Sequence, residues 1–207
     1  MTSPALNRIY DTAKVYLPGA LDAAMQLEFF HLLDDFFSMT NCWTEDIQFP
    51  VTVTTLTYLE DPLQYTYTLT PSLGLIIRTA TIFNRDGVPV PATMPVPGDL
   101  VLVNGPNTAD TYTARVILTV SDPLTREGNT QLPEWVLNKY SGCLLEGLVG
   151  RMMMQPAKPY TAKQDGLFHM KNYLSGRSDA KIEAARQNVY GGQAWQFPQQ
   201  FATRRWR

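Results

Sequence analysis

LDAAMQLEFFHLLDDFFSM, residues 21–39, carries the strongest structural signal in this chain. Its apolar residues recur at steps of three and four, the period of a single buried face of an α-helix. The residues on this face are Leu21, Met25, Phe29, Leu32, Leu33, Phe36 and Phe37. Asp22 places negative charge in the first turn, where the helix dipole favours it, and Thr40-Asn41 supply stop residues. The stretch predicts an amphipathic helix that needs other elements to cover it.

The segments on either side of this helix differ in period. Upstream, Leu6–Tyr16 predicts a short helix ended by Pro18-Gly19. Downstream, β-branched and aromatic runs are separated by Pro, Gly, Asn and Asp turn signals, a pattern typical of an antiparallel sheet arranged as a sandwich. These runs cover residues 51–57, 65–69, 75–83, 100–103 and 113–120. The prolines at 89, 91, 95 and 97 indicate a loop or an edge strand, because Pro cannot donate to a central ladder.

Helical periodicity returns after Leu132-Pro133. One continuous helix is expected, with Trp135 or Val136, Tyr140, Cys143, Leu144, Gly147, Leu148, Arg151 and Met152 along one side. Its Met152–Met154 run is interpreted as adaptable core. Pro156 and Pro159 end this helix, Thr161 is expected to cap the next one, and Gly191-Gly192 follow its predicted end near Tyr190.

The order of these segments predicts an α+β fold, a helical bundle interrupted by an antiparallel β-domain insertion. Residues 1–43 and 132–190 are assigned to the helical bundle domain and residues 44–131 to the β-rich insertion. Residues 191–207 are expected to form an extended C-terminal arm.

The expected arm contains GQAWQFPQQFATRRWR, residues 192–207, a sequence rich in aromatic residues and arginine. Protein interfaces select these residue types, so we predict that the arm docks on a neighbouring protein. The candidate binding residues are Trp195, Phe197, Pro198, Phe201, Arg204, Arg205, Trp206 and Arg207. The alternative is that the arm folds back on its own domain.

Charge is distributed unevenly along the 207 residues, although the formal net charge is only −2. From Lys171 onward there are seven basic and two acidic residues, whereas the preceding part carries ten basic and seventeen acidic ones. This balance suits a chain that assembles through its basic end. It does not suit a general nucleic-acid binder, which needs a broad basic face.

The two cysteines and the apolar segments limit the class of protein. Cys42 and Cys143 form no CxxC pair or Cys/His cluster, so we expect reduced, buried thiols and no metal site. The N-terminal segment lacks the apolar core of a signal peptide, and no apolar run approaches the length of a membrane span. We expect an intracellular product that does not insert into membranes.

No catalytic signature is apparent in the sequence. His31 lies within helical reach of Glu28 and Asp35, and His169 within reach of Asp165, but exposed histidines or simple ion pairs are the favoured interpretation. GxSxG and the Gly-rich phosphate-binding motifs are absent, so no cofactor is expected. The paired carboxylates, at 34–35, 45–46 and 60–61, are adjacent in sequence and point in different directions. We therefore predict no catalytic residue, no cofactor-binding residue and no metal ligand.

Several segments together resemble the tailed-bacteriophage head-to-tail adaptor proteins, also called connector or head completion proteins. They are LPGA (17–20), FFSMTNCW (36–43), VILTVSDP (116–123), LPEWVLNKYSGCLLEGLVGRMMMQPAKPY (132–160), KIEAARQNVYGG (181–192) and WQFPQQF (195–201). The resemblance covers almost the whole chain, and the P-x-K-P-Y turn and the W-x-F-P arm are its most specific parts.

This resemblance implies a structural virion protein that is made in the host cytoplasm and placed at the head–tail interface. Such proteins form a homo-oligomeric ring, usually of twelve copies, that joins the portal protein to the tail nozzle or tail tube protein. Viral DNA passes through the channel without sequence-specific binding, and no membrane is involved. Trp195, Phe197 and Phe201 would be the apolar anchors on the portal, and Arg204, Arg205 and Arg207 would meet its acidic surface.

Two other classes of function stay open at this point. A phage-associated cell-wall glycan hydrolase would need two carboxylates in one cleft, with the pKa of one raised. A β-rich binding module could use strand tyrosines on its surface, namely Tyr58, Tyr65, Tyr67 and Tyr112.

Overall fold

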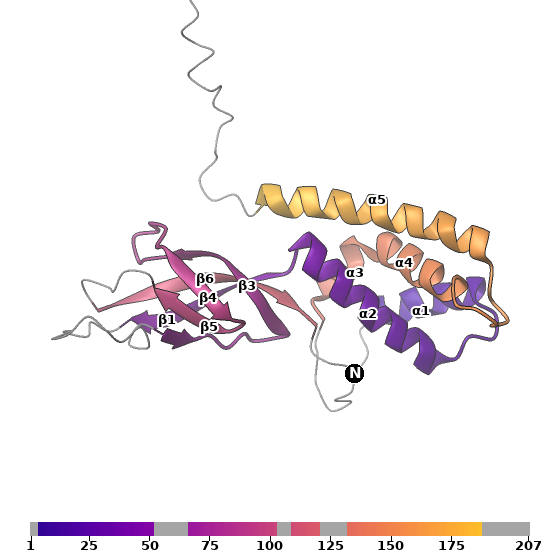
Figure 1. Cartoon of the computed structure of the whole chain (residues 1–207), viewed down its shortest axis with the longest axis horizontal. Helices are drawn as coiled ribbons and strands as arrows, with labels where there is room; N and C mark the ends of the chain where they lie inside the picture. Colours follow the sequence, from indigo (N-terminus) through magenta and orange to yellow (C-terminus); the bar gives the residue numbers. More distant parts are fainter. Residues whose placement is uncertain (1–3, 52–65, 103–108, 121–131, 188–207) are drawn as a thin grey trace, which may run out of the picture.

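The computed structural model describes residues 4–51, 66–102, 109–120 and 132–187. Figure 1 shows an elongated molecule with helices at one end and strands at the other. The chain passes through two helices, then the strands, and then three helices, which pack back onto the first two. The predicted α+β fold is confirmed, whereas the expected arm lies outside the described residues.

The two N-terminal helices are α1 (Pro4–Tyr16) and α2 (Asp22–Thr40). The predicted apolar face of α2 is buried from Met25 to Phe37, but Leu21 is 74% exposed, so its assignment to this face was wrong. Leu21 is the residue before the helix and its backbone is extended, which turns its side chain away from the buried face. α2 ends as predicted at Asn41, whose φ of 56° is left-handed and whose N–H donates to the Phe37 carbonyl over 3.0 Å.

The C-terminal helices are α3 (Glu134–Lys139), α4 (Ser141–Met153) and α5 (Lys163–Gln187). The single helix expected after Pro133 is therefore broken, at Tyr140, whose φ of −107° and ψ of 16° leave the helical region. This turn places the Tyr140 ring 5.4 Å from the Phe36 ring, between centroids, and lets its hydroxyl donate to Glu183 over 3.0 Å.

Two smaller predictions about the turn between α4 and α5 need correction. The Thr161 hydroxyl does not cap α5; it donates to the Gln155 carbonyl and accepts from the Lys158 N–H, which fastens the turn itself. Of the methionine run, Met152 and Met153 are buried core residues as predicted, whereas Met154 is exposed.

α4 is the central helix of the bundle and contacts α1, α2, α3 and α5. Leu144, Leu148 and Met152 on α4 are fully buried. At Gly150 the approach to α5 is so close that an added Cβ would lie 2.9 Å from the Met170 backbone nitrogen and 3.1 Å from the Gly166 carbonyl oxygen. Glycine at this position therefore permits backbone-to-backbone packing of α4 and α5.

The β insertion consists of two three-stranded antiparallel sheets. The strands are β1 (Thr44–Val51), β2 (Thr66–Thr68), β3 (Leu75–Phe83), β4 (Ala92–Val96), β5 (Asp99–Leu102) and β6 (Asp110–Thr119). The sheet orders are β1-β6-β3 and β2-β5-β4. β4 is an edge strand, as predicted from its Pro95. The first strand begins at Thr44 rather than at Val51, and the predicted alternation at 52–57 lies outside the described residues.

The two sheets share a core. Phe49 of β1 lies 5.2 Å from Tyr67 of β2, between ring centroids. Buried residues of both sheets, including Val116 and Leu100, belong to the same apolar cluster as the helices, and the sandwich stays a prediction.

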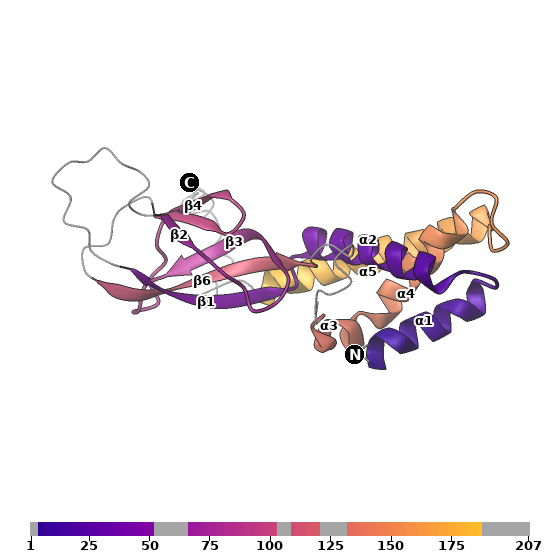
Figure 2. The same ribbon diagram turned by 90° about the horizontal axis from the view of Figure 1, so that it is seen from below.

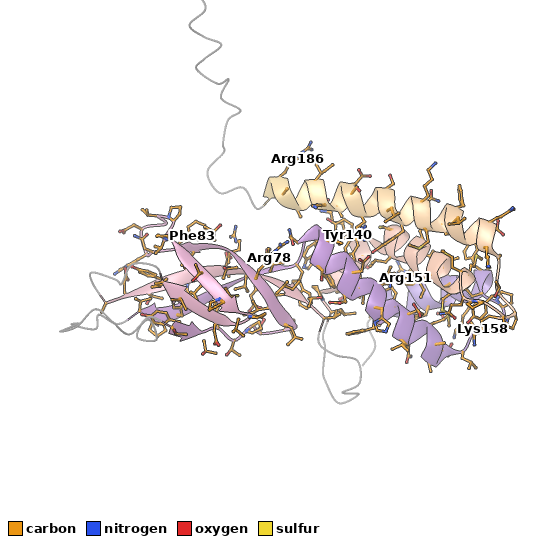
Figure 3. The ribbon with its side chains drawn as sticks, viewed as in Figure 1. Arg78, Phe83, Tyr140, Arg151, Lys158 and Arg186 are labelled. Atoms are coloured by element: carbon orange, nitrogen blue, oxygen red, sulfur yellow. The ribbon has the colours of Figure 1, made fainter. Side chains whose placement is uncertain are left out.

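A compact junction joins the helices to the strands (Figure 2). Trp43 is buried there, 5.1 Å from the Phe37 ring, and its carbonyl accepts the N–H of Leu118 over 2.9 Å. The Asp34 carboxylate accepts the Thr119 hydroxyl over 2.7 Å. Arg78, labelled in Figure 3, donates to the side chain of Asn41. α2 is thereby bound to β3 and β6 at the point where the chain enters the insertion.

Candidate functional site

The candidate binding arm follows the end of α5. All of its predicted residues, Trp195, Phe197, Pro198, Phe201, Arg204, Arg205, Trp206 and Arg207, lie outside the described residues. The last described turn of α5 carries Arg186, at the helix end that lies nearest the strands (Figure 3). α5 therefore ends near the junction and not at the far tip of the bundle.

The histidines occupy ordinary surface positions. His31 is exposed on α2, as predicted. His169 on α5 was expected to pair with Asp165, but its Nδ1 lies 2.8 Å from Glu146 Oε2 on α4. The Asn172 amide donates to the same oxygen over 3.1 Å. The partner is missed by helical spacing because it comes from a neighbouring helix 23 residues earlier in the chain.

The two thiols are free and half-buried. Burial raises the pKa of Cys42 to about 11, and burial likewise raises the pKa of Cys143 to about 11. At neutral pH both are therefore protonated, and a thiol is a poor nucleophile compared with the thiolate. The geometry favours the predicted role as small packing residues.

The described paired carboxylates, at 34–35 and 45–46, diverge as predicted, whereas the pair at 60–61 lies outside the described residues. Asp34 points to Thr119 across the junction, whereas Asp35 points into the bundle toward Arg177. Glu45 accepts the backbone N–H of Ser72, and Asp46 accepts two hydrogen bonds of 2.7 Å from Arg115. These hydrogen bonds hold the pKa of Asp46 below its ordinary value. The four described carboxylates thus each contact a different partner.

Asp35 is the centre of a polar network that the sequence does not reveal. Its Oδ2 lies 2.7 Å from Arg177 Nη1 on α5 and 3.4 Å from Arg151 Nη2 on α4, and it accepts the Tyr173 hydroxyl over 2.8 Å. Burial, with the Asp35 carboxylate beside it, raises the pKa of Tyr173. The network joins three helices and has a structural role, because both arginines are occupied by the carboxylate.

A second polar contact fixes the end of α3 to α5. Lys139 Nζ lies 2.5 Å from Glu183 Oε1, and the Tyr140 hydroxyl donates to the other carboxylate oxygen. The hydrogen bond to Glu183 raises the pKa of Lys139. The hydrogen bond from Lys139 in turn lowers the pKa of Glu183.

The described residues contain no group of three or more His, Cys, Asp or Glu side chains placed to hold a metal ion. Among them there is also no helix with the length and hydropathy of a membrane span.

The candidate tyrosines of a β-rich binding module are not available as a set. Tyr67 and Tyr112 are half-buried, and both pack against Phe49. Tyr58 and Tyr65 lie outside the described residues. The two described tyrosines therefore help to hold the sheets together.

α5 carries several large apolar side chains that are exposed. Its inward side carries Gly166, Tyr173, Ala180 and Ala184, all buried. Its outward side carries four exposed large apolar residues, namely Leu167, Phe168, Leu174 and Ile182. Phe168 is 63% exposed, although it is a large aromatic residue. These exposed apolar residues, with Lys171 and Ser178 among them, are a candidate surface for contact with another protein.

No family model matches this chain, and no curated protein sequence matches it.

Proposed function

We propose that this chain is a head-to-tail adaptor of a tailed-bacteriophage particle. In this role it forms a ring, of twelve copies by analogy with the family it resembles, between the portal protein and the tail nozzle or tail tube protein. The ring extends the channel through which viral DNA passes. The protein acts as a structural component of the virion and not as an enzyme.

The observation that carries this proposal is the division of the molecule into a helical end and a β end, in a chain whose sequence continues after α5 with an aromatic, Arg-rich segment. The bundle presents exposed apolar helix surface, the sheets lie at the opposite end, and α5 ends near the junction (Figure 1). An adaptor needs separate surfaces for its copies, for the portal and for the tail, and the bundle, the sheets and the segment after α5 are the proposed sources of these surfaces.

The charge balance supports the same function. The part of the chain before Lys171 carries ten basic and seventeen acidic residues. Surfaces with an acidic excess repel the DNA backbone, so a channel built from them would let DNA slide without adhering.

Portal binding through the arm is tested by deleting residues 193–207. We expect the truncated chain to keep its circular dichroism spectrum and thermal transition but to lose binding to the portal protein of the same phage, measured by co-sedimentation. Aromatic anchors repeated around a ring act together, so the loss is expected to be complete within detection. A truncated chain that still binds the portal would refute the assignment of the arm.

Two point variants separate apolar from electrostatic attachment. Trp195→Ala is expected to weaken portal binding by about 2 kcal/mol or more, as is typical of an interface aromatic residue. Arg207→Ala is expected to weaken it by less than about 1 kcal/mol, because an exposed charge contributes little. The opposite ranking would mean that charge attraction dominates the attachment.

A further inference from the structure

The outward side of α5 is apolar and basic. Lys163, Leu167, Lys171, Leu174, Lys181 and Ile182, here called the α5 outer stripe, are all exposed and lie on one side of the helix. Asp165 and Asp179 lie further round the helix, toward its other edge. Within the described part of the chain, the three lysines of the stripe form no ion pair.

The outward side of α2 has the complementary character. Ala23, Leu27, His31 and Asp34, with Glu28 at the edge, form the α2 outer face. α2 carries four acidic residues and no Lys or Arg. Asp22 and Asp35 have basic partners, but the described partners of Glu28 and Asp34 are the neutral Gln155 amide and Thr119 hydroxyl. Among the described residues, neither of these two carboxylates forms an ion pair.

The two surfaces are placed so that neighbouring copies can join them. Figure 1 shows α5 along the upper edge of the bundle and α2 below it, both running from the far tip toward the strands. A neighbour related by rotation about an axis along the molecule keeps these directions. Its α2 then meets α5 in parallel, a heterologous contact that closes into a ring when the rotation divides a full turn.

The spacing along the two helices agrees with this parallel contact. Leu27 and Asp34 are seven residues apart on α2, and Leu174 and Lys181 are seven residues apart on α5. Seven residues correspond to two helical turns, or about 10.5 Å. In parallel register, Leu27 meets Leu174 while Asp34 meets Lys181.

We propose that the α2 outer face of one copy binds the α5 outer stripe of the next copy. This contact rests on the ring of the proposed function and names the surfaces that build it. The apolar residues supply the adhesion, and the lysines and carboxylates set the direction of the contact and disfavour the α5–α5 alternative, in which lysines would face lysines.

Charge reversal on the full-length chain tests the contact. Asp34→Lys and Lys181→Glu are each expected to weaken self-association, measured by sedimentation velocity, by at least about tenfold. The double variant is expected to recover to within about threefold of the wild type, because the pair is restored in reverse. Arg8→Glu on α1 is the control for Lys181→Glu, with the same charge change on an exposed residue away from both surfaces. Failure of the double variant to recover would overturn the pairing.

Mixing two one-sided variants gives a second, independent result. Leu27→Asp blocks only the α2 outer face, and Leu174→Asp blocks only the α5 outer stripe. Each alone is expected to stay monomeric, while the mixture forms pairs and nothing larger, because one intact contact is left. Circular dichroism checks that both variants are folded. Pairs formed by either variant alone, or a wild-type chain that is monomeric up to millimolar concentration, would overturn the proposal.

Portal binding by the same variants separates this contact from the proposed function. Variants that no longer self-associate are expected to bind the portal as single copies through the arm. If the wild type binds the portal but does not self-associate, the proposed α2–α5 contact is wrong and the adaptor function stands. If the wild type self-associates but does not bind the portal, the adaptor function is wrong and the contact stands.

Discussion

Contacts in the helical end connect residues that are far apart in the sequence, whereas contacts in the β end connect residues that are closer in the sequence. Asp35 contacts Tyr173 and Arg177 across 138 and 142 residues, while the salt bridge from Asp46 to Arg115 in the β end spans 69. The bundle is therefore complete only when α4 and α5 have packed onto α1 and α2. The strands pair with one another and are fastened to α2 at the junction, so the insertion interrupts the sequence of the bundle but not its packing.

The largest effect is expected from Phe36→Ala in the bundle. Phe36 is fully buried, beside the Phe37 and Tyr140 rings, and removing such a side chain costs about 3–5 kcal/mol. Urea denaturation measures the loss. Hydrogen exchange is expected to accelerate in α4 and α5 while β3 and β6 keep their protection. Equal loss of protection in both ends would show that they unfold as one unit, and the distinction between the helical end and the β end would not hold.

The next effect is expected from Asp35→Asn. This change removes the carboxylate charge that Arg151 and Arg177 share and leaves two half-buried guanidinium groups without it. A loss of about 2 kcal/mol in the free energy of unfolding is expected. Asn can still accept the Tyr173 hydroxyl, so the variant should stay folded. A loss below about 0.5 kcal/mol would mean that apolar packing alone holds the three helices.

Substitution of two glycines in α4 tests how closely α4 approaches α5. Gly150→Ala would place a methyl group against the backbone of α5, and overpacking of this kind costs about 1–3 kcal/mol. Gly142→Ala is the matched control, because nothing lies within 4 Å of its added Cβ. The control is expected to raise the thermal midpoint through a gain in helix propensity of up to about 1 kcal/mol. Both variants moving in the same direction would contradict the close approach.

The smallest effect is expected from Asp46→Asn in the β end, the counterpart of Asp35→Asn. The Asp46 side chain is 47% exposed, so its pair with Arg115 contributes about 1 kcal/mol or less. Because the hydrogen bonds from Arg115 lower the folded pKa of Asp46, the pair stabilises the fold above the ordinary pKa of 3.8. This contribution disappears as the pH falls through the folded pKa. Wild type and variant should therefore differ in stability at pH 7 and converge in strong acid; a constant difference would exclude this linkage.

Local patterns predicted the elements of the fold well. The period of α2, the run at 75–83 and the edge proline of β4 each reflect a property of neighbouring residues. The predictions that were wrong depend on distant contacts. Tyr140 breaks the expected helix because its ring packs on Phe36 and its hydroxyl binds Glu183. Glu183 is more than 40 positions from Tyr140, so a single sequence does not reveal that the two residues are in contact.

The candidate site was predictable only in part. The exposed histidine at 31 and the divergence of Asp34 and Asp35 follow from helix geometry, and both were predicted. The pairing of His169 with Glu146, the network around Asp35 and the outward direction of Leu167 and Leu174 require knowledge of which helices are neighbours. The arm was singled out by composition alone, and its docking stays a prediction.

The pairing of β1 with β6 has a mechanical consequence. Thr44 lies opposite Ile117, so the chain enters and leaves the insertion side by side, with the two strands antiparallel along the length of the molecule (Figure 2). A pull that separates the two ends of the molecule loads both strands in tension together and does not slide one along the other. The load is therefore shared between the two paired strands.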